Sequence, residues 1–252
     1  MGRVRDQLDK PCLIRQSRPK QPIGRLMDKT QIRNASTVIV LRDKLTSPKV
    51  LMGQRGENAA FMPSKFVFPG GALDPVDSQV ALTTPLAEPC MARLRKDADP
   101  DLAEPLVLAA LREMWEETGL LLGHPDAAAR ALAAAQPEDW RSYFEHGVLP
   151  GGEGMKFVFR AITPPGRPRR FDARFFLVDA DRIVSDLDDF SAASEELGRL
   201  QWIPLDEARS FDLPFITEVV LAEVEADLKE PDRNARVPFF YNEEGRSFFA
   251  RL

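Results

Sequence analysis

The segment that most constrains this chain is a short helical stretch crowded with acidic residues. A helix advances about 100° per residue, so in residues 111–119 Glu113, Glu116 and Glu117 would fall within an arc of about 100°. The opposite side of the same helix is apolar and contains Val107, Leu111, Met114 and Trp115. Such a helix needs another layer against which its apolar side can pack, and its carboxylates would then gather at the edge of that layer.

Residues that favour helix ends mark the boundaries of this helix. Asp99 or Asp101 can cap the first turn, and Gly119 can adopt the left-handed conformation that commonly ends a helix. We therefore expect the helix to run from Asp101 or Leu102 to Thr118.

Short β-branched and apolar runs on both sides of this helix predict strands. They lie at residues 35–41, 50–53, 66–68, 157–163, 174–178 and 200–203. Further helices are expected at residues 126–135, 138–145 and 214–229, and a terminal hairpin at residues 237–241 and 247–250. This interleaving of strands and helices predicts an α/β or α+β sandwich.

A glycine pair follows the third expected strand and forms the first candidate functional loop. The strand ends abruptly at Pro69-Gly70-Gly71, where paired glycines permit backbone angles and close approaches that other residues cannot adopt. Residues 72–101 are rich in Pro, Asp and Ala and separate this turn from the acidic helix, so we interpret them as an insertion.

The three glutamates can be interpreted in two ways. Two unit charges about 4 Å apart repel by roughly 4 kcal/mol at the effective dielectric near a protein surface. A bound divalent cation turns this repulsion into attraction, and carboxylate oxygens suit Mg²⁺ or Mn²⁺ better than zinc. The alternative is a solvated helix face, where like charges one turn apart cost only about 0.2–0.5 kcal/mol.

Composition argues against several other kinds of protein. The two cysteines, Cys12 and Cys90, are too few for a disulfide framework, and the two histidines, His124 and His146, lack neighbours that would make a zinc site or a catalytic triad. No apolar run reaches the roughly 18–20 residues that span a bilayer, and no secretory signal is evident. We expect a chain of a reducing compartment, the cytoplasm, with no membrane partner.

Charge is distributed unevenly along the chain. Residues 1–30 contain eight Lys or Arg and three acids, which gives +5, whereas the net charge of the whole chain is −5. The remainder is therefore acidic, which disfavours nucleic-acid binding. We expect residues 1–30 to form a poorly ordered basic arm and residues 31–252 to form a single domain, as a monomer or a homodimer.

The acidic helix resembles half of a known motif, the Nudix box. The pattern Arg-Glu-aliphatic-any-Glu-Glu-any-Gly-aliphatic is matched by Arg112, Glu113, Met114, Glu116, Glu117, Gly119 and Leu120. The first half of the motif resembles Phe68-Pro69-Gly70-Gly71, but Asp77 stands at the glutamate position and a long segment precedes Arg112. The resemblance implies a Nudix-type α/β/α sandwich with a mixed central sheet and a helical insertion.

A long segment inside the box is also found in Nudix proteins similar to the peroxisomal coenzyme A diphosphatases. The similarity extends over downstream segments at residues 163–164, 169–172, 175–176, 195–196 and 202–208, and covers roughly residues 35–228. The resemblance implies hydrolysis of the diphosphate bond of a nucleoside diphosphate derivative, with coenzyme A or acyl coenzyme A as the leading substrate. The alternatives are ADP-ribose, NADH or a dinucleotide, or a non-catalytic nucleotide-binding module.

The resemblance also implies roles for individual residues of the box. Glu113, Glu116 and Glu117 would bind Mg²⁺ together with the carbonyl oxygen of Gly70, and Arg112 would orient the acids. The general base is open among Glu113, Glu195 and Glu196, and Asp77 is either a weaker metal-site residue or a turn former.

Arginines and one aromatic residue are the candidates for substrate binding. Arg169, Arg170 and Arg174 surround Phe171 in an expected loop, where guanidinium groups can bind phosphate and the ring can support a base. Arg55 ends a segment that resembles one preceding the box in coenzyme A hydrolysing relatives. The last three residues, 250–252, loosely resemble a peroxisomal address, which leaves the peroxisome as the alternative location.

Overall fold

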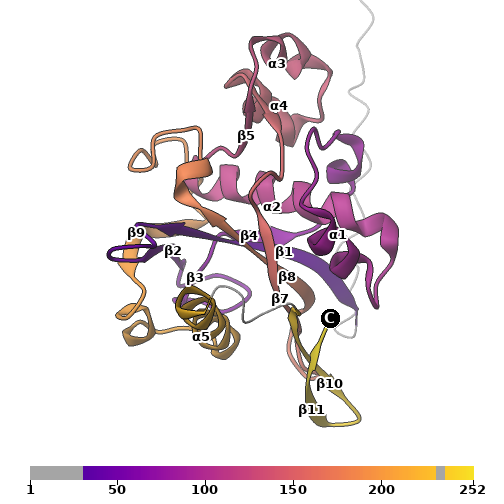
Figure 1. Cartoon of the computed structure of the whole chain (residues 1–252), viewed down its shortest axis with the longest axis vertical. Coiled ribbons are helices and arrows are strands. Elements are labelled where there is room, and N and C mark those ends of the chain that lie inside the picture. Colours follow the sequence, from indigo (N-terminus) through magenta and orange to yellow (C-terminus); the bar gives the residue numbers. More distant parts are fainter. Residues whose placement is uncertain (1–30, 231–235) are drawn as a thin grey trace, which may run out of the picture.

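A central sheet with helices on both faces organises the molecule (Figure 1). The structure is a computed structural model that describes residues 31–230 and 236–252. The basic arm predicted at residues 1–30 and Cys12 lie outside the described residues.

Within the described residues, the main sheet has nine strands and mixes parallel with antiparallel pairs. They are β1 (Ile32–Arg42), β2 (Lys49–Arg55), β3 (Phe66–Val67), β4 (Gly70–Ala72), β7 (Lys156–Ile162), β8 (Arg170–Asp179), β9 (Leu197–Pro204), β10 (Pro238–Glu243) and β11 (Arg246–Arg251). Their order is β11-β10-β7-β8-β1-β2-β3, with β4 paired to β1 and β9 paired to β2. Strands β5 (Gly123–Pro125) and β6 (Val148–Pro150) form a separate pair.

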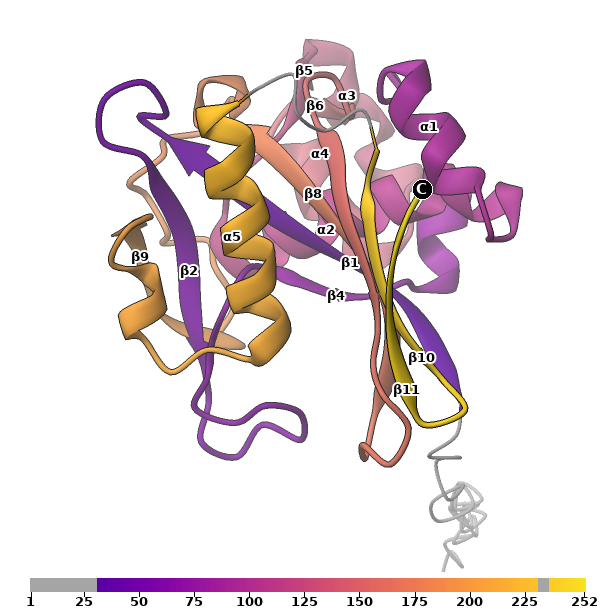
Figure 2. The ribbon, with the colours of Figure 1, turned by 60° about the horizontal axis from the view of Figure 1, so that its bottom comes forward.

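The helices divide between the two faces of the sheet (Figures 1 and 2). They are α1 (Glu88–Arg95), α2 (Ala103–Thr118), α3 (Ala127–Leu132), α4 (Glu138–Glu145) and α5 (Phe215–Lys229). Short 3-10 turns are η1 (Pro75–Gln79), η2 (Pro100–Leu102), η3 (Ala133–Ala135), η4 (Ala180–Arg182) and η5 (Ala208–Ser210). Helix α2 lies on one face and α5 on the other, which confirms the predicted mixed α/β sandwich.

The alternation of side chains along β1 creates two hydrophobic cores. Val38 is buried in the core that contains the apolar side of α2, and the next residue, Ile39, is buried in the core that contains α5. Because successive side chains of a strand point to opposite faces, one β-branched run can supply both cores. A sheet covered on both faces in this way holds its strand ends in fixed positions.

Helix α2 agrees closely with the expectation from sequence. Its predicted apolar side is buried, with Val107, Leu111 and Met114 fully inaccessible to solvent. It ends at Gly119, which has a φ of 74° and donates its N–H to the carbonyl of Trp115. The helix begins at Ala103, and Asp99 instead caps the preceding 3-10 turn.

Several elements differ from the expectation. Strand β8 begins at Arg170, four residues before the predicted position, so the connection to β7 is shorter than expected. The glycine turn is itself the short strand β4, and the segment interpreted as an insertion contains η1, α1 and η2. Among the described residues, no helix is long and apolar enough to cross a membrane.

Candidate metal centre and substrate cavity

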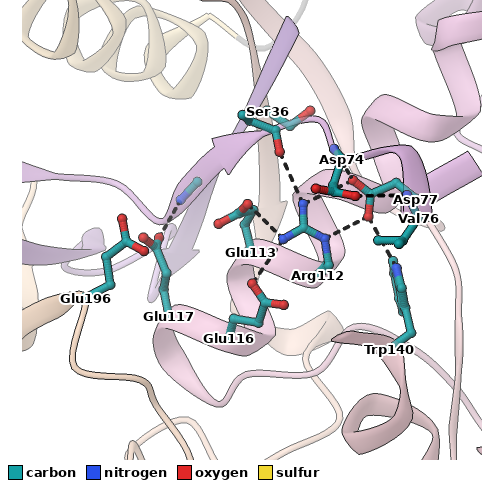
Figure 3. A network of polar contacts seen from close by, with 12 residues as sticks. Ser36, Asp74, Val76, Asp77, Arg112, Glu113, Glu116, Glu117, Trp140 and Glu196 are labelled. Atoms are coloured by element: carbon teal, nitrogen blue, oxygen red, sulfur yellow. Dashed lines mark hydrogen bonds and ion pairs between the residues drawn. The ribbon is translucent and has the colours of Figure 1, made fainter. Parts of the chain in front are cut away.

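The guanidinium group of Arg112 organises the acidic cluster (Figure 3). Its Nε and one Nη bond both oxygens of Asp77 at 2.7 and 3.1 Å, and its other Nη bonds Glu113 at 2.9 Å and Glu116 at 3.0 Å. A fifth bond reaches the carbonyl of Ala72 at 3.2 Å. Since arginine carries five N–H donors, every donor of this residue is engaged. Arg112 therefore contacts two of the three box glutamates, and its orienting role stays a prediction.

Asp77 is part of the support of this cluster. It is fully buried, and it accepts hydrogen bonds from the backbone N–H of Asp74 at 2.9 Å and from the indole of Trp140 at 3.2 Å. It does not line the cavity described below. Its turn-forming role is thus real, but its main contact is the bidentate ion pair with Arg112, which links η1 to α2.

Glu117 has an unsatisfied oxygen beside the glycine pair. Its Oε2 accepts the N–H of Gly70 at 2.7 Å, whereas its buried Oε1 has no hydrogen-bond partner. Burial, and next the negative charge of Glu113, raise the pKa of the Glu117 carboxyl well above its usual range. An unpaired carboxylate oxygen in such a place is costly unless a cation or a proton compensates it.

Glu113 lies directly behind the second glycine. A Cβ atom added to Gly71 would lie 2.3–2.5 Å from the carboxylate atoms of Glu113, so a larger residue at this position would displace the carboxylate from where Arg112 holds it. Burial, together with the charge of Glu116 and against the attraction of Arg112, raises the pKa of Glu113 to about 7. Burial also raises the pKa of Glu116.

The carboxylate oxygens of Glu113, Glu116 and Glu117 fit a divalent cation, although they are not already arranged around one point. Within residues 31–230 and 236–252, no three acidic, histidine or cysteine side chains converge into a ready ligand set, and Arg112 forms ion pairs with Glu113 and Glu116. The set nevertheless consists of hard oxygen atoms, includes the orphaned oxygen of Glu117, and has more carboxylates than guanidinium groups. Such a set suits a hard divalent cation.

A cavity of about 920 Å³ lies next to Gly70 and Gly71, on the side away from the acidic cluster. Gly70 and Gly71 form part of its wall, and Glu117 and Glu113 lie behind them. Arg55 and Glu196 also line the cavity and form an ion pair at 2.9 Å. Its volume lies in the range of small-molecule sites, which is roughly 300–1,000 Å³.

The structure separates the two neighbouring candidates for the general base. Glu196 faces the cavity, and its charge contributes to the raised pKa values of Glu113 and Glu117. Glu195 is exposed and does not line the cavity. Figure 3 shows Glu196 beside Glu117.

The predicted substrate-binding residues divide between two faces of the sheet. Arg169 and Phe171 line the cavity, but Arg170 and Arg174 do not. Arg174 is 1% exposed and bonds Asp172 and other groups on the face covered by α2, so its expected role in substrate binding is wrong. Arg170 bonds the carbonyl of Thr163 instead. Once β8 begins at Arg170, alternation places these two arginines away from Phe171.

Sequence reasoning missed several residues that line the same cavity. They include Arg33, Phe61, Arg167 and Phe215. Arg33 lies two residues before the expected start of the first strand. Had the strand been predicted to start earlier, alternation would have placed Arg33 on the same face as Ala35 and Thr37, which also line the cavity.

Comparisons with known proteins agree with this fold. No protein-family model matches the chain. The chain is similar to a Caenorhabditis elegans protein named "Putative nudix hydrolase 7", with 27% identity over 180 residues, 68% of this chain and 51% of the relative. The chain thus spans about half the length of this curated relative.

One solved structure shows the same similarity. A Nudix hydrolase from Alicyclobacillus acidocaldarius superposes with a TM-score of 0.56 at 27% identity, covering 79% of this chain and 96% of that one. The Nudix domain of Shewanella oneidensis NrtR, complexed with ADP ribose, gives a TM-score of 0.45 at 12% identity, with 79% and 89% coverage. The Caenorhabditis and Alicyclobacillus similarities, taken with the fold, make the chain similar to Nudix hydrolases both in sequence and in structure.

Proposed function

We propose that this chain hydrolyses the diphosphate bond of a nucleoside diphosphate derivative, with a divalent cation, Mg²⁺ or Mn²⁺, held by Glu113, Glu116 and Glu117. The observation that carries this proposal is the buried, unpartnered Oε1 of Glu117, located behind the glycine wall of a cavity of nucleotide size. Buried carboxylates in excess of their cationic partners can bind a metal cation, and that cation can in turn bind an anionic substrate in the neighbouring cavity.

The cation would supply charge neutralisation of the diphosphate and acidification of a water molecule. The carbonyl oxygen of Gly70 is a further proposed ligand, although the contact present in the structure is made by its N–H. Glu116 is partly exposed and bound to Arg112 through one oxygen only, so its other oxygen is available.

Residues of this chain would orient the metal ligands and take the proton from the attacking water. Arg112 keeps Glu113 and Glu116 oriented, and Asp77 keeps Arg112 in place. We propose Glu113, with a pKa of about 7, and Glu196, at the cavity wall, as the two candidates to take a proton from the attacking water. Glu195, which is exposed and belongs neither to the cavity lining nor to the ion pairs of Arg112, is not proposed for this role.

For the substrate, we propose coenzyme A or acyl coenzyme A ahead of ADP-ribose, NADH and dinucleotides. An extended substrate is supported by a cavity that combines the glycine wall, in front of the acidic cluster, with arginines and an aromatic pair, Phe61 and Phe171, whose ring centroids are 5.2 Å apart. Aromatic faces and guanidinium groups are the usual partners of bases and phosphates.

A substrate panel tests the proposal. The purified chain would be incubated with Mg²⁺ or Mn²⁺ and each of coenzyme A, ADP-ribose, NADH and diadenosine polyphosphates, and the products would be separated by chromatography. We expect cleavage of the diphosphate bond of at least one compound and loss of cleavage in Glu117→Gln. Binding of these compounds without cleavage under any metal would overturn the proposal in favour of a non-catalytic nucleotide-binding module.

A further inference from the structure

One end of the cavity lies well away from the acidic cluster and is cationic. Along β1, Arg33, Ala35 and Thr37 all line the cavity, since alternate residues of a strand share a face. Thr37 pairs with Gly70 at the acidic end, and Arg33 pairs with Phe171 at the other. Four residues of strand correspond to about 13 Å. The cavity therefore extends well beyond the place where a diphosphate would meet the glutamates.

Three arginines gather at this far end without acidic partners. Arg33, Arg167 and Arg169 line the cavity, and none has an ion pair or a side-chain hydrogen bond within the part of the chain that the structure describes. Arg55, nearer the acidic end, is paired with Glu196. In a chain with a net charge of −5, carboxylates are plentiful, yet these three arginines line one end of the cavity without acidic partners, so their charge is available to an anion from outside the chain.

The surroundings of these arginines favour a nucleoside. Phe61 of the β2–β3 loop contacts the edge of Phe171 at the start of β8, so two loops approach each other beside the arginines. Figure 2 shows both loops at the lower end of the molecule. The sheet floor between the two ends is made of small residues, namely Ala35, Ala72, Ala161 and Ala173. A flat ring system fits over such a floor next to aromatic edges.

We propose that Arg33, Arg167 and Arg169 form a subsite for a phosphomonoester carried by the ribose of the substrate, separate from the diphosphate that is cleaved. This inference rests on the proposed function and narrows it. The substrate class would be nucleoside diphosphate derivatives with an additional 3′- or 2′-phosphate. Coenzyme A and NADPH carry this group, whereas ADP-ribose and NADH lack it.

Matched substrate pairs test the subsite. We would measure kcat/KM for coenzyme A against dephospho-coenzyme A and for NADPH against NADH. The phosphorylated member of at least one pair should be preferred by about tenfold or more, as expected for charge-assisted bonds to phosphate. Preference in the first pair identifies a 3′-phosphate and preference in the second a 2′-phosphate. Equal kcat/KM within both pairs would overturn the proposal while leaving diphosphate hydrolysis established.

Arginine variants test whether Arg33, Arg167 and Arg169 cause the preference for the phosphorylated substrate. Arg33→Gln, and the double variant Arg167→Gln with Arg169→Gln, should bring the ratio within the preferred pair close to one. The matched control is Arg141→Gln, which removes the same charge from an exposed arginine of α4 outside the cavity. This control should keep the ratio of the unaltered chain. A ratio that survives both cavity variants would overturn the assignment.

A binding experiment separates this inference from the proposed function. Calorimetric titration with adenosine 3′,5′-bisphosphate, adenosine 2′,5′-bisphosphate and AMP needs no turnover. One bisphosphate should bind about tenfold more tightly than AMP, and the two cavity variants should abolish the difference. If the chain cleaves none of the four substrates but shows this binding pattern, the proposed function fails and the subsite stands. Equal affinity for the three ligands would overturn the subsite.

Discussion

Two buried networks of ion pairs are both built from arginines and acidic residues, but they differ in which charge is in excess. On the face of the sheet covered by α2, Arg160 bonds both oxygens of Asp172 at 2.9 and 2.7 Å, and Arg174 bonds the same carboxylate at 3.1 Å. Asn34 and the carbonyl of Asp97 accept further bonds from the two arginines. In this network, cations are in surplus, and neutral oxygens surround them.

The Arg112 network has the opposite surplus. Three carboxylates, those of Asp77, Glu113 and Glu116, pair with one guanidinium group, and beside them an oxygen of Glu117 remains without a partner. The first network is closed, because groups of the fold itself neutralise or bond its charges. The second network is incomplete, because a carboxylate oxygen behind the cavity wall has no partner. A closed network should govern stability, and an incomplete one should govern activity.

The largest expected effect is the loss of turnover on changing Glu117. Glu117→Gln keeps the size of the side chain and removes the buried charge. We expect kcat/KM to fall by at least about a hundredfold, the upper range of losses caused even by residues that only support a metal ligand. The melting temperature without metal should not fall, since the substitution removes a buried repulsion. The control is Glu104→Gln, an exposed position on the same helix, which should retain full activity.

The second effect is a loss of stability on changing Asp172. Asp172→Ala leaves Arg160 and Arg174 buried without an acid, which should cost about 3–5 kcal/mol in the free energy of unfolding. Denaturant titration measures it. Asp179→Ala, on the same strand, removes only the exposed pair with Lys44 and should cost at most about 1 kcal/mol. Equal losses for the two variants would contradict the closed network.

The third effect concerns Asp77, which supports the Arg112 network from outside the cavity. Asp77→Asn weakens the ion pair that holds Arg112, so metal affinity should fall about 10–100-fold. Calorimetric titration with Mn²⁺ measures this. Asp74→Asn is the matched control, because asparagine caps a helical turn as well as aspartate does. Unchanged affinity in Asp77→Asn would show that Arg112 needs no such support.

The smallest effect is the pH dependence of stability without metal. The folded-state pKa of Glu113, about 7, lies above its usual value of about 4.5, so its proton stabilises the folded state at low pH. This contribution is present below about pH 4.5 and is lost as pH rises through about 7. The melting temperature should therefore fall by a few degrees between these values. Glu113→Gln should reduce the change without abolishing it, because the pKa values of Glu116 and Glu117 are raised as well, and a slope of the opposite sign would contradict the prediction.

Local patterns predicted the acidic helix, but not its partners. The spacing of the glutamates and Gly119 follows from helical periodicity, and both the buried side and the end of α2 are confirmed. The pairing of Arg112 with Asp77 joins residues 35 positions apart, and no local pattern encodes it. The same holds for the parallel pairing of β1 with β8, which places Arg33 beside Phe171.

The error at Arg174 has a simple physical origin. A strand that starts at Arg174 leaves the preceding arginines in a loop, where side chains can point anywhere. The actual strand starts at Arg170 and fixes its side chains in alternation, so Phe171 faces the cavity while Arg170 and Arg174 face away. Strand boundaries, which are the least certain part of a sequence prediction, thus determined which residues belong to the site.

Calorimetric titration of the full chain with Mn²⁺ or Mg²⁺ tests most directly whether the incomplete network holds a cation. We expect the unaltered chain and Glu104→Gln to bind the cation equally, and Glu117→Gln to bind it at least about tenfold more weakly. Absence of binding to the unaltered chain, or equal affinity in Glu117→Gln, would contradict the assignment of this cluster as a metal centre.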